Sequence, residues 1–251
     1  MSSNADEALY VDSTPSCPAA ISRAAVVIAV AVLAFSPVVL CRFIEWDDPQ
    51  HVAANPDLID PSLSTLAHYW TAPFEGLYIP VAYTVWFAVA LLSPRHGALD
   101  PLPFHVLNLL VHLCSTMLVF SILRRLTRGN VTAAAIGAAI FAVHPVQVET
   151  VAWVSGLRDL LCGLFSLVAI RLYIRGMDED RAIILLAATV SFVLALLSKP
   201  AAVCVPLVVL VIHGMILKLP WRRAVPVIAG WLALAVVDTL VTRHVQPASE
   251  A

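Results

Sequence analysis

The chain of 251 residues is 60% apolar and only 13% charged, whereas about a quarter of the residues in ordinary soluble domains are charged. This composition excludes a soluble globular protein and predicts an all-α integral membrane protein with one continuous helical domain. The formal net charge of −2 does not indicate nucleic acid as a partner, and none is predicted. The partner that the composition predicts is the lipid bilayer.

The N-terminal tail is polar and carries Asp6, Glu7 and Asp12. The apolar run that follows, Ala24–Leu40, is too long for the core of a cleaved signal peptide, and no typical cleavage site comes after it. We therefore predict a cytoplasmic tail over residues 1–22, a retained anchor, and a polytopic membrane domain over residues 23–251.

Further apolar runs follow along the chain. They cover Ile79–Ser93, Leu102–Leu123, Val131–Val143, Leu160–Ile174, Ala182–Leu197, Ala201–Leu217 and Ala224–Val241. A straight membrane-spanning helix needs about 20 residues, so the runs Ile79–Ser93, with 15 residues, and Val131–Val143, with 13, are short. The distribution of charge decides whether Ile79–Ser93 crosses, because cytoplasmic loops are rich in lysine and arginine.

With a cytoplasmic N-terminus and an Ile79–Ser93 run that does not cross, ten lysines and arginines lie inside and five outside. If this run crosses, the count reverses. The sequence therefore predicts about seven transmembrane helices, one amphipathic or juxtamembrane helix on the outer surface, and an outer loop over residues 42–78. Most of the unusual polar residues then lie near the outer face of a cell (cytoplasmic or inner) membrane, so we expect an extracytoplasmic active face.

Two adjacent carboxylates, Asp47 and Asp48, follow the first apolar run closely in the outer loop. Ionisable groups at a membrane face are costly to dehydrate and are therefore candidates for a functional site. A carboxylate near an apolar face has a raised proton affinity, which suits a general base that accepts a hydroxyl proton. The same pair is also a candidate site for a divalent cation, and the sequence does not separate the two roles. No other metal site is predicted.

Three polar residues, His105, Asn108 and His112, lie on one apolar segment with a spacing of three and then four residues. On a helix they fall within about 60° of one another and form a polar stripe. Asn108 and His112 lie deeper, and we expect them to hydrogen-bond between helices. His105, near the outer end, is the better candidate for contact with a ligand.

Pro145 disfavours helical geometry at His144, so we expect the chain to break there and to expose the imidazole. Glu149 follows on a short helix. Asp159 occupies the position of an N-cap before the apolar run that begins at Leu160.

Arg158 and Lys199 are predicted to lie at the same outer face. Arginine is a natural ligand of phosphate. Lys199 precedes Pro200, which suits the first residue of a helix, and a helix N-terminus favours anions. Two cations, several carboxylates and two histidines are thus expected on one side of the membrane.

In chain order, the segments WDD, YIPVAYTVWF, FHVLNLLVH, FAVHPVQVETVAWVSGLRDLL and LALLSKPAAVCVP resemble the tetratricopeptide-repeat transmembrane O-mannosyltransferases and their bacterial relatives. These are polytopic enzymes of the glycosyltransferase C type superfamily. The resemblance covers about residues 43–217, and the HP-x-x-x-E segment with its trailing W-V-S-G-x-R-D is the most specific part. It implies transfer of a sugar, in this family mannose, from a polyprenyl-phosphate donor to an extracytoplasmic hydroxyl of a protein or glycan.

The resemblance also implies roles for individual residues. Asp47 or Asp48 would be the base that activates the acceptor hydroxyl. Five residues would surround the donor phosphate and sugar: His105, His144, Glu149, Arg158 and Lys199.

Two features depart from the family pattern. Family members continue with more spans and a soluble tetratricopeptide array, whereas this sequence stops after a predicted seventh span and no 34-residue repeat follows. Tyr78-Ile79-Pro80 occupies a place where a basic residue often precedes the proline. The alternative to an enzyme is therefore a catalytically inactive or truncated membrane partner that retains the fold. A transporter is a further alternative, against which the gathering of unusual residues at one face argues.

Overall fold

The computed structural model describes residues 17–93 and 97–245. In these ranges every regular element is a helix, and the only strand-like pairing is an isolated bridge between Phe74 and Leu77. The all-α prediction is confirmed. Most of the predicted N-terminal tail lies outside the described residues.

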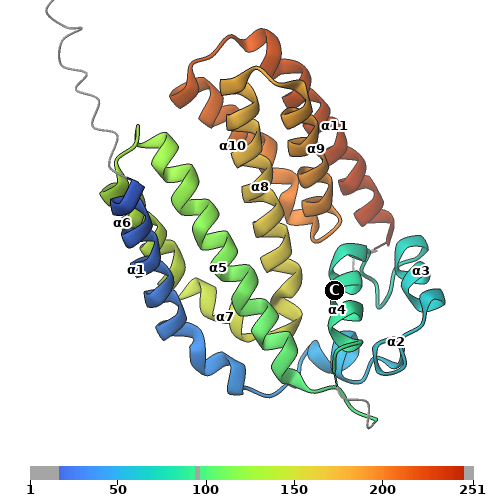
Figure 1. Ribbon diagram of the computed structural model, residues 1–251. Coiled ribbons are helices and arrows are strands. Elements are labelled where there is room, and N and C mark those ends of the chain that lie inside the picture. Colours follow the sequence, from blue (N-terminus) through green and yellow to red (C-terminus); the bar gives the residue numbers. More distant parts are fainter. Residues whose placement is uncertain (1–16, 94–96, 246–251) are drawn as a thin grey trace, which may run out of the picture.

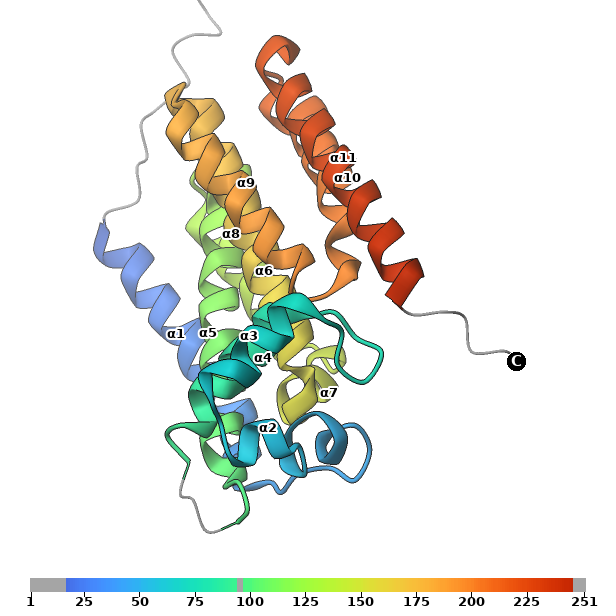
Figure 2. The same ribbon diagram turned by 90° about the vertical axis from the view of Figure 1, so that its right-hand side faces the viewer.

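Long helices run back and forth between two ends of the molecule (Figure 1). The α-helices are α1 (Cys17–Phe35), α2 (Pro56–Ile59), α3 (Leu63–Thr71), α4 (Pro80–Ala90), α5 (Pro101–Leu126), α6 (Val131–Val143), α7 (Val146–Ala152), α8 (Leu157–Glu179), α9 (Ala182–Leu196), α10 (Val205–Val211) and α11 (Trp221–Val245). They are joined or extended by short 3-10 or π segments, which are η1 (Ser36–Leu40), η2 (Pro49–Ala53), η3 (Val154–Gly156), η4 (Pro200–Cys204) and η5 (Ile212–Leu217). We call the end that holds α2, α3, α4 and α7 the loop end, and the end with the α8–α9 and α10–α11 turns the hairpin end (Figures 1 and 2).

Five helical segments are long and apolar enough to cross a membrane: Pro18–Leu40, Pro101–Leu126, Val154–Glu179, Pro200–Leu217 and Trp221–Val245. Helices α6 and α7 qualify together as a sixth, although they are bent by 61°. The bend lies at His144, whose backbone is extended, because a residue before proline disfavours helical geometry. The chain is thus a helical membrane protein with the break that the sequence predicts.

Helix α9 has 15 residues and is the one member of the predicted set of seven spans that is not among these six. It begins at the hairpin end after Asp180, whose left-handed backbone (φ 54°) ends α8. It leads to Lys199, whose ammonium contacts Asp159 in the first turn of α8. α9 therefore runs nearly the full height of α8 (Figure 2). This path supports a seventh crossing, which stays a prediction.

Close packing joins α8 and α9 near the hairpin end. A Cβ on Gly176 of α8 would lie 2.7 Å from the Cδ2 atom of Leu185 in α9. A larger residue at position 176 would push the two helices apart, so glycine is needed for this approach.

Helix α4 is not the amphipathic surface helix that the run Ile79–Ser93 was predicted to form. It has 11 residues, and eight of them are buried, among them Tyr83 and Trp86. It contacts α2 and α3, which belong to the outer loop, and also α5 and α8. The polar loop folds over this apolar helix, so α4 forms part of the core at the loop end. That it does not cross the membrane stays a prediction.

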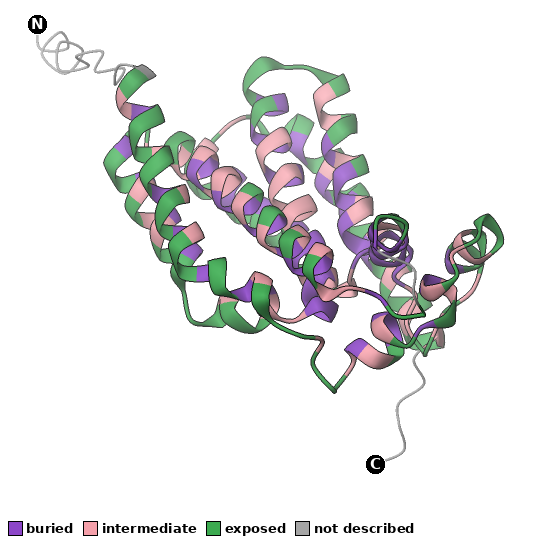
Figure 3. Cartoon of the chain, turned by 60° about the horizontal axis from the view of Figure 1, so that its bottom comes forward, coloured by how far each residue is buried: buried purple, intermediate pink, exposed green. Residues whose placement is uncertain are grey.

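Exposed residues lie along the outward faces of the long helices (Figure 3), and many of them are large and apolar. Leu33 of α1 is 77% exposed, Ile136 of α6 58% and Leu240 of α11 61%. Extended apolar surfaces of this kind are unusual on proteins that meet only water. We therefore expect these apolar faces to contact lipid.

Candidate functional site

The two adjacent carboxylates of the outer loop point to different partners. Asp48 is fully buried. One of its oxygens accepts hydrogen bonds from the backbone N–H and the hydroxyl of Ser155, at 2.8 and 2.6 Å, and the other accepts from the N–H of Ile44 at 2.9 Å. These bonds tie the start of the outer loop to η3, so Asp48 supports the site from within.

Gly156, next to Ser155, allows this tie. A Cβ at position 156 would lie 2.4 Å from the carbonyl oxygen of Thr150. Any other residue would therefore push η3 away from α7. The glycine lets the backbone of Ser155 reach Asp48.

Asp47 is the first member of a charge chain, a row of side chains of alternating charge that continues through Arg158 and Asp159 of α8 to Lys199. Its carboxylate accepts from the Nη2 of Arg158 at 2.9 Å, and the Nε of Arg158 lies 3.9 Å from a carboxylate oxygen of Asp159. Asp159 in turn binds the ammonium of Lys199 at 2.5 Å. The structure thus brings Asp47, Arg158 and Lys199 together, as expected from the need to compensate charge beside lipid. None of these side chains is fully buried.

Asp159 does not cap α8 as the sequence predicted. The N-cap position is held by Gly156, and Asp159 lies in the first turn of the helix. Its carboxylate binds the ammonium of Lys199 instead of the free backbone N–H groups at the start of the helix. Lys199 does precede a helical segment, η4, as predicted.

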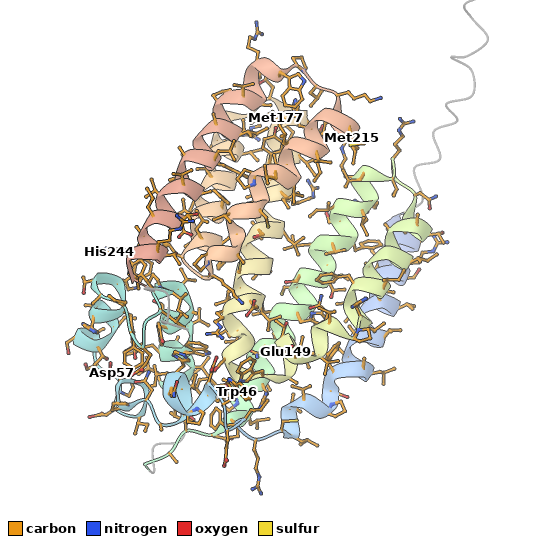
Figure 4. All side chains as sticks on the ribbon, turned by 180° about the vertical axis from the view of Figure 1, so that it is seen from behind. Trp46, Asp57, Glu149, Met177, Met215 and His244 are labelled. Atoms are coloured by element: carbon orange, nitrogen blue, oxygen red, sulfur yellow. The ribbon has the colours of Figure 1, made fainter. Side chains whose placement is uncertain are left out.

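A cavity of about 330 Å³ opens beside the two cations. Its walls include Arg158 and Lys199, the segment Leu77–Ile79 of the outer loop, and Thr242 and Val245 at the end of α11. Tyr78, which departs from the family pattern, is therefore part of the wall. His244, close to the same end of α11, lies beside the outer-loop helices (Figure 4). A cavity lined by two cationic side chains at one end of the helix bundle can hold a phosphate group.

Behind Asp47 lies a buried polar network that the sequence reasoning missed. The Nδ1 atom of His51 lies 2.7 Å from the hydroxyl of Tyr83, and the amide nitrogen of Asn55 donates to the hydroxyl of Tyr69 at 3.1 Å. The two tyrosine rings are stacked with centroids 4.4 Å apart. The signal in the sequence is the spacing of four residues from Asp47 to His51 and from His51 to Asn55, which is typical of one helix face.

Burial controls the protonation of this network. It lowers the pKa of His51, and the positive charge of Arg158 adds to the effect. Burial also raises the pKa values of Tyr69 and Tyr83 well above their usual range. His51 is therefore neutral near pH 7, and both hydroxyls keep their protons.

The polar stripe on α5 divides as expected between its deeper and its outer members. The amide nitrogen of Asn108 donates to the carbonyl of Trp153 at 2.7 Å, and the Nε2 of His112 lies 2.9 Å from the carbonyl of Ala142. His105 is fully buried, and within the described residues neither ring nitrogen has a hydrogen-bond partner. It does not line the cavity beside Arg158, so its contact with a ligand stays a prediction.

Glu149 and His144 are both exposed. Glu149 lies with Trp46 and Trp153 in the wall of a second, mostly apolar hollow of about 620 Å³, and Figure 4 shows Glu149 and Trp46 close together. The Trp153 ring also lies 5.9 Å from the guanidinium carbon of Arg158, so one tryptophan adjoins both hollows. The Nδ1 of His144 accepts from the N–H of Val146 at 3.2 Å and lines neither hollow.

No group of three or more histidine, cysteine, aspartate or glutamate side chains in residues 17–93 and 97–245 is arranged to hold a metal ion. Asp47 and Asp48 point their carboxylates at Arg158 and Ser155 respectively. In the described structure both carboxylates thus engage protein partners, and a divalent cation at this pair stays a prediction.

Comparison with known proteins identifies relatives of one kind. The chain is 27% identical over 175 residues to a protein O-mannosyl-transferase of Caenorhabditis elegans, covering 64% of this chain and 24% of that protein. It is 31% identical over 165 residues to one of Drosophila melanogaster, covering 63% and 19%. It is 32% identical over 155 residues to the human protein O-mannosyl-transferase TMTC4, covering 54% and 20%.

The resemblance to the protein O-mannosyl-transferases is confirmed. The chain spans about a quarter or less of the length of these relatives. No family model matches it, and no solved structure matches it. The similarity to protein O-mannosyl-transferases therefore rests on the sequence of the membrane helices and their connections.

Proposed function

We propose that the chain is a mannosyltransferase module that moves mannose from a polyprenyl-phosphate donor to an extracytoplasmic hydroxyl of a protein or glycan. The observation that carries the proposal is the cavity at the loop end, which Arg158 and Lys199 line and beside which Asp47 pairs with Arg158. The similarity to protein O-mannosyl-transferases supports the choice of mannose and of a protein acceptor. In this proposal the protein lies in the cell membrane (cytoplasmic or inner), and its loop end faces the extracytoplasmic side.

Asp47 is the better candidate for the general base. Its carboxylate is part-exposed at 25% and pairs with Arg158, whereas Asp48 is fully buried and accepts three hydrogen bonds. A base must reach the proton that it removes. Asp48 is then a positioning residue that fixes the loop on which Asp47 lies.

Arg158 and Lys199 are the candidates for holding the donor phosphate. Each is now paired with a carboxylate, Arg158 with Asp47 and Lys199 with Asp159. A phosphate that binds between the two cations would compete with these carboxylates. Its arrival would loosen Asp47 from Arg158 and so prepare the base for the acceptor.

The proposed reaction is a single displacement. Asp47 accepts the proton of the acceptor hydroxyl while the hydroxyl oxygen forms a bond to the anomeric carbon of the sugar. The bond from that carbon to the phosphate oxygen breaks, and its electron pair leaves with the lipid phosphate. The two cations stabilise the charge that grows on this phosphate.

Reconstituted protein tests the proposal. The unaltered chain should bind a polyprenyl phosphate and transfer mannose from the mannosylated lipid to a serine- or threonine-containing peptide. Transfer without dependence on Asp47 or Arg158 would contradict the assignment of the site. Binding of the lipid phosphate without any transfer would favour the alternative, a catalytically inactive or truncated membrane partner that retains the fold.

A further inference from the structure

A pocket of arginines lies at the hairpin end, opposite the proposed donor site. It has a volume of about 320 Å³ and is lined by Ser121, Arg124, Arg125, Arg128, Gly129 and Arg171. These residues come from the last turns of α5, the turn that follows it, and the middle of α8. The proposed transfer reaction gives this pocket no role.

The pocket carries a surplus of positive charge. Arg125 binds both carboxylate oxygens of Asp178, at 2.7 and 2.8 Å. Arg171 donates to the hydroxyl of Ser121 at 2.9 Å. Within the part of the chain that the structure describes, Arg124, Arg128 and Arg171 form no ion pair. Among the described residues, four guanidinium groups line this small hollow, and one carboxylate, that of Asp178, pairs with one of them.

The turn that bears Arg128 has a left-handed backbone. Arg128 and Gly129 both have left-handed backbones, with φ of 53° and 87°. The turn that they form ends α5, and the N–H of Gly129 donates to the carbonyl of Arg124 at 2.8 Å. Basic residues at a helix C-terminus are favoured by the helix dipole. That explanation does not extend to Arg171, which lies far from either end of α8.

Apolar side chains lie one turn from the pocket on the same helix. Leu167 precedes Arg171 by one helical turn on the same face of α8. Leu167 and Ile170 line a mostly apolar groove of about 430 Å³, which shares no lining residue with the arginine pocket and extends to Asp159 and Ala201 at the loop end. A soluble anion would use only the arginines, whereas a membrane lipid would also use the apolar side chains next to Arg171, which favours a lipid.

We propose that the arginine pocket binds the phosphate headgroup of an anionic membrane phospholipid, with an acyl chain lying against Leu167 and Ile170. Arginine forms strong, charge-assisted hydrogen bonds with phosphate oxygens, and basic pockets between transmembrane helices bind anionic headgroups. The lipid would come from the leaflet at the hairpin end. The arginine pocket shares no lining residue with the proposed donor cavity at the loop end.

Native mass spectrometry of the full chain in detergent tests the proposal with two probes, phosphatidylglycerol and phosphatidylcholine. We expect tighter binding of the anionic lipid. Arg171→Gln and Arg128→Asn should each weaken binding of phosphatidylglycerol by about fivefold and leave phosphatidylcholine unchanged, since each basic residue near a lipid surface contributes a similar amount. Asparagine is chosen at position 128 because it tolerates the left-handed backbone.

Arg175→Gln is the matched control. Arg175 lies one turn after Arg171 on α8, pairs with Glu179 at 2.6 Å and does not line the pocket. The thermal unfolding of each variant shows that it is folded. The proposal is overturned if Arg175→Gln weakens phosphatidylglycerol binding as much as Arg171→Gln does, or if both lipids bind equally. If inorganic phosphate binds as tightly as phosphatidylglycerol, with the same dependence on Arg171, the ligand is a soluble anion and the lipid proposal is overturned.

Discussion

Asp48 and Ser155 are 107 residues apart in the chain, yet two hydrogen bonds of 2.8 and 2.6 Å join them in the buried interior of the loop end. This contact fastens the outer loop to the segment that begins α8. The contact also fixes the position of Asp47, because the residue that precedes a fixed aspartate is held in place as well. The position of Asp47 beside Arg158 therefore depends on the partners of its neighbour.

Asp48→Asn should lower the stability of the protein. Both carboxylate oxygens accept hydrogen bonds, and an amide offers only one acceptor, so one buried N–H or O–H group loses its partner. We expect a cost of about 1–3 kcal/mol in the free energy of unfolding. Denaturant unfolding in detergent measures it, with Asp60→Asn, an exposed position in the same loop, as the control. Equal stability of the two variants would contradict a structural role for Asp48.

Asp47→Asn should leave the fold intact and reduce transfer. The side chain of Asp47 is part-exposed and forms an ion pair with Arg158, which also lies near Asp159. Loss of a general base typically slows a reaction by about 10²- to 10⁴-fold. The assay is mannose transfer from a polyprenyl-phosphate donor by reconstituted protein. Activity close to that of Asp60→Asn would remove Asp47 from the list of bases.

Arg158→Gln and Lys199→Gln should weaken binding of the lipid phosphate. Both cations line the cavity at the loop end. Hydrogen bonds to charged groups contribute about 1.5–3 kcal/mol each, so we expect binding of polyprenyl phosphate to fall by roughly 10- to 100-fold. The control is Arg42→Gln, an exposed arginine at the same end of the molecule that does not line the cavity. An equal loss in Arg42→Gln would show only a general effect of charge.

Local rules in the sequence predicted part of this site. Pro145 predicted the break at His144, and Pro200 placed Lys199 before a helical segment. The need to compensate charge near lipid predicted that Asp47, Arg158 and Lys199 would meet. These features depend on neighbouring residues or on the membrane, and both can be recognised in a sequence.

Long-range packing could not be predicted in the same way. The apolar residues of α4 are buried because α2 and α3 cover them, and nothing in the run Ile79–Ser93 indicates that cover. The partners of Asp48 and His51 lie 107 and 32 residues away. Which of two adjacent aspartates is buried depends on where these partners arrive.

His51 should make stability depend on pH. Burial, aided by the charge of Arg158, lowers its pKa in the folded protein. As the pH falls below about 6.5, the unfolded chain takes up a proton that folded His51 resists, so the folded state loses stability until the pH reaches the folded pKa. His51→Gln should therefore flatten the fall in unfolding free energy between pH 7 and pH 5. The exposed His144→Gln is the control, and an identical slope in all three proteins would contradict the effect.

Gly156→Ala should disturb the contact between Ser155 and Asp48 without touching either side chain. A Cβ at position 156 would lie 2.4 Å from the carbonyl oxygen of Thr150, whereas a Cβ at Gly163, inside the following helix α8, meets nothing within 4 Å. We expect Gly156→Ala to cost about 1–3 kcal/mol through overpacking and Gly163→Ala to be neutral or to stabilise by about 0.5–1 kcal/mol. Because the strain acts through Ser155, its cost should shrink when Asp48→Asn is already present, which a double-mutant cycle of unfolding free energies measures. Full additivity of the two changes would show that Gly156 and Asp48 stabilise the loop end independently.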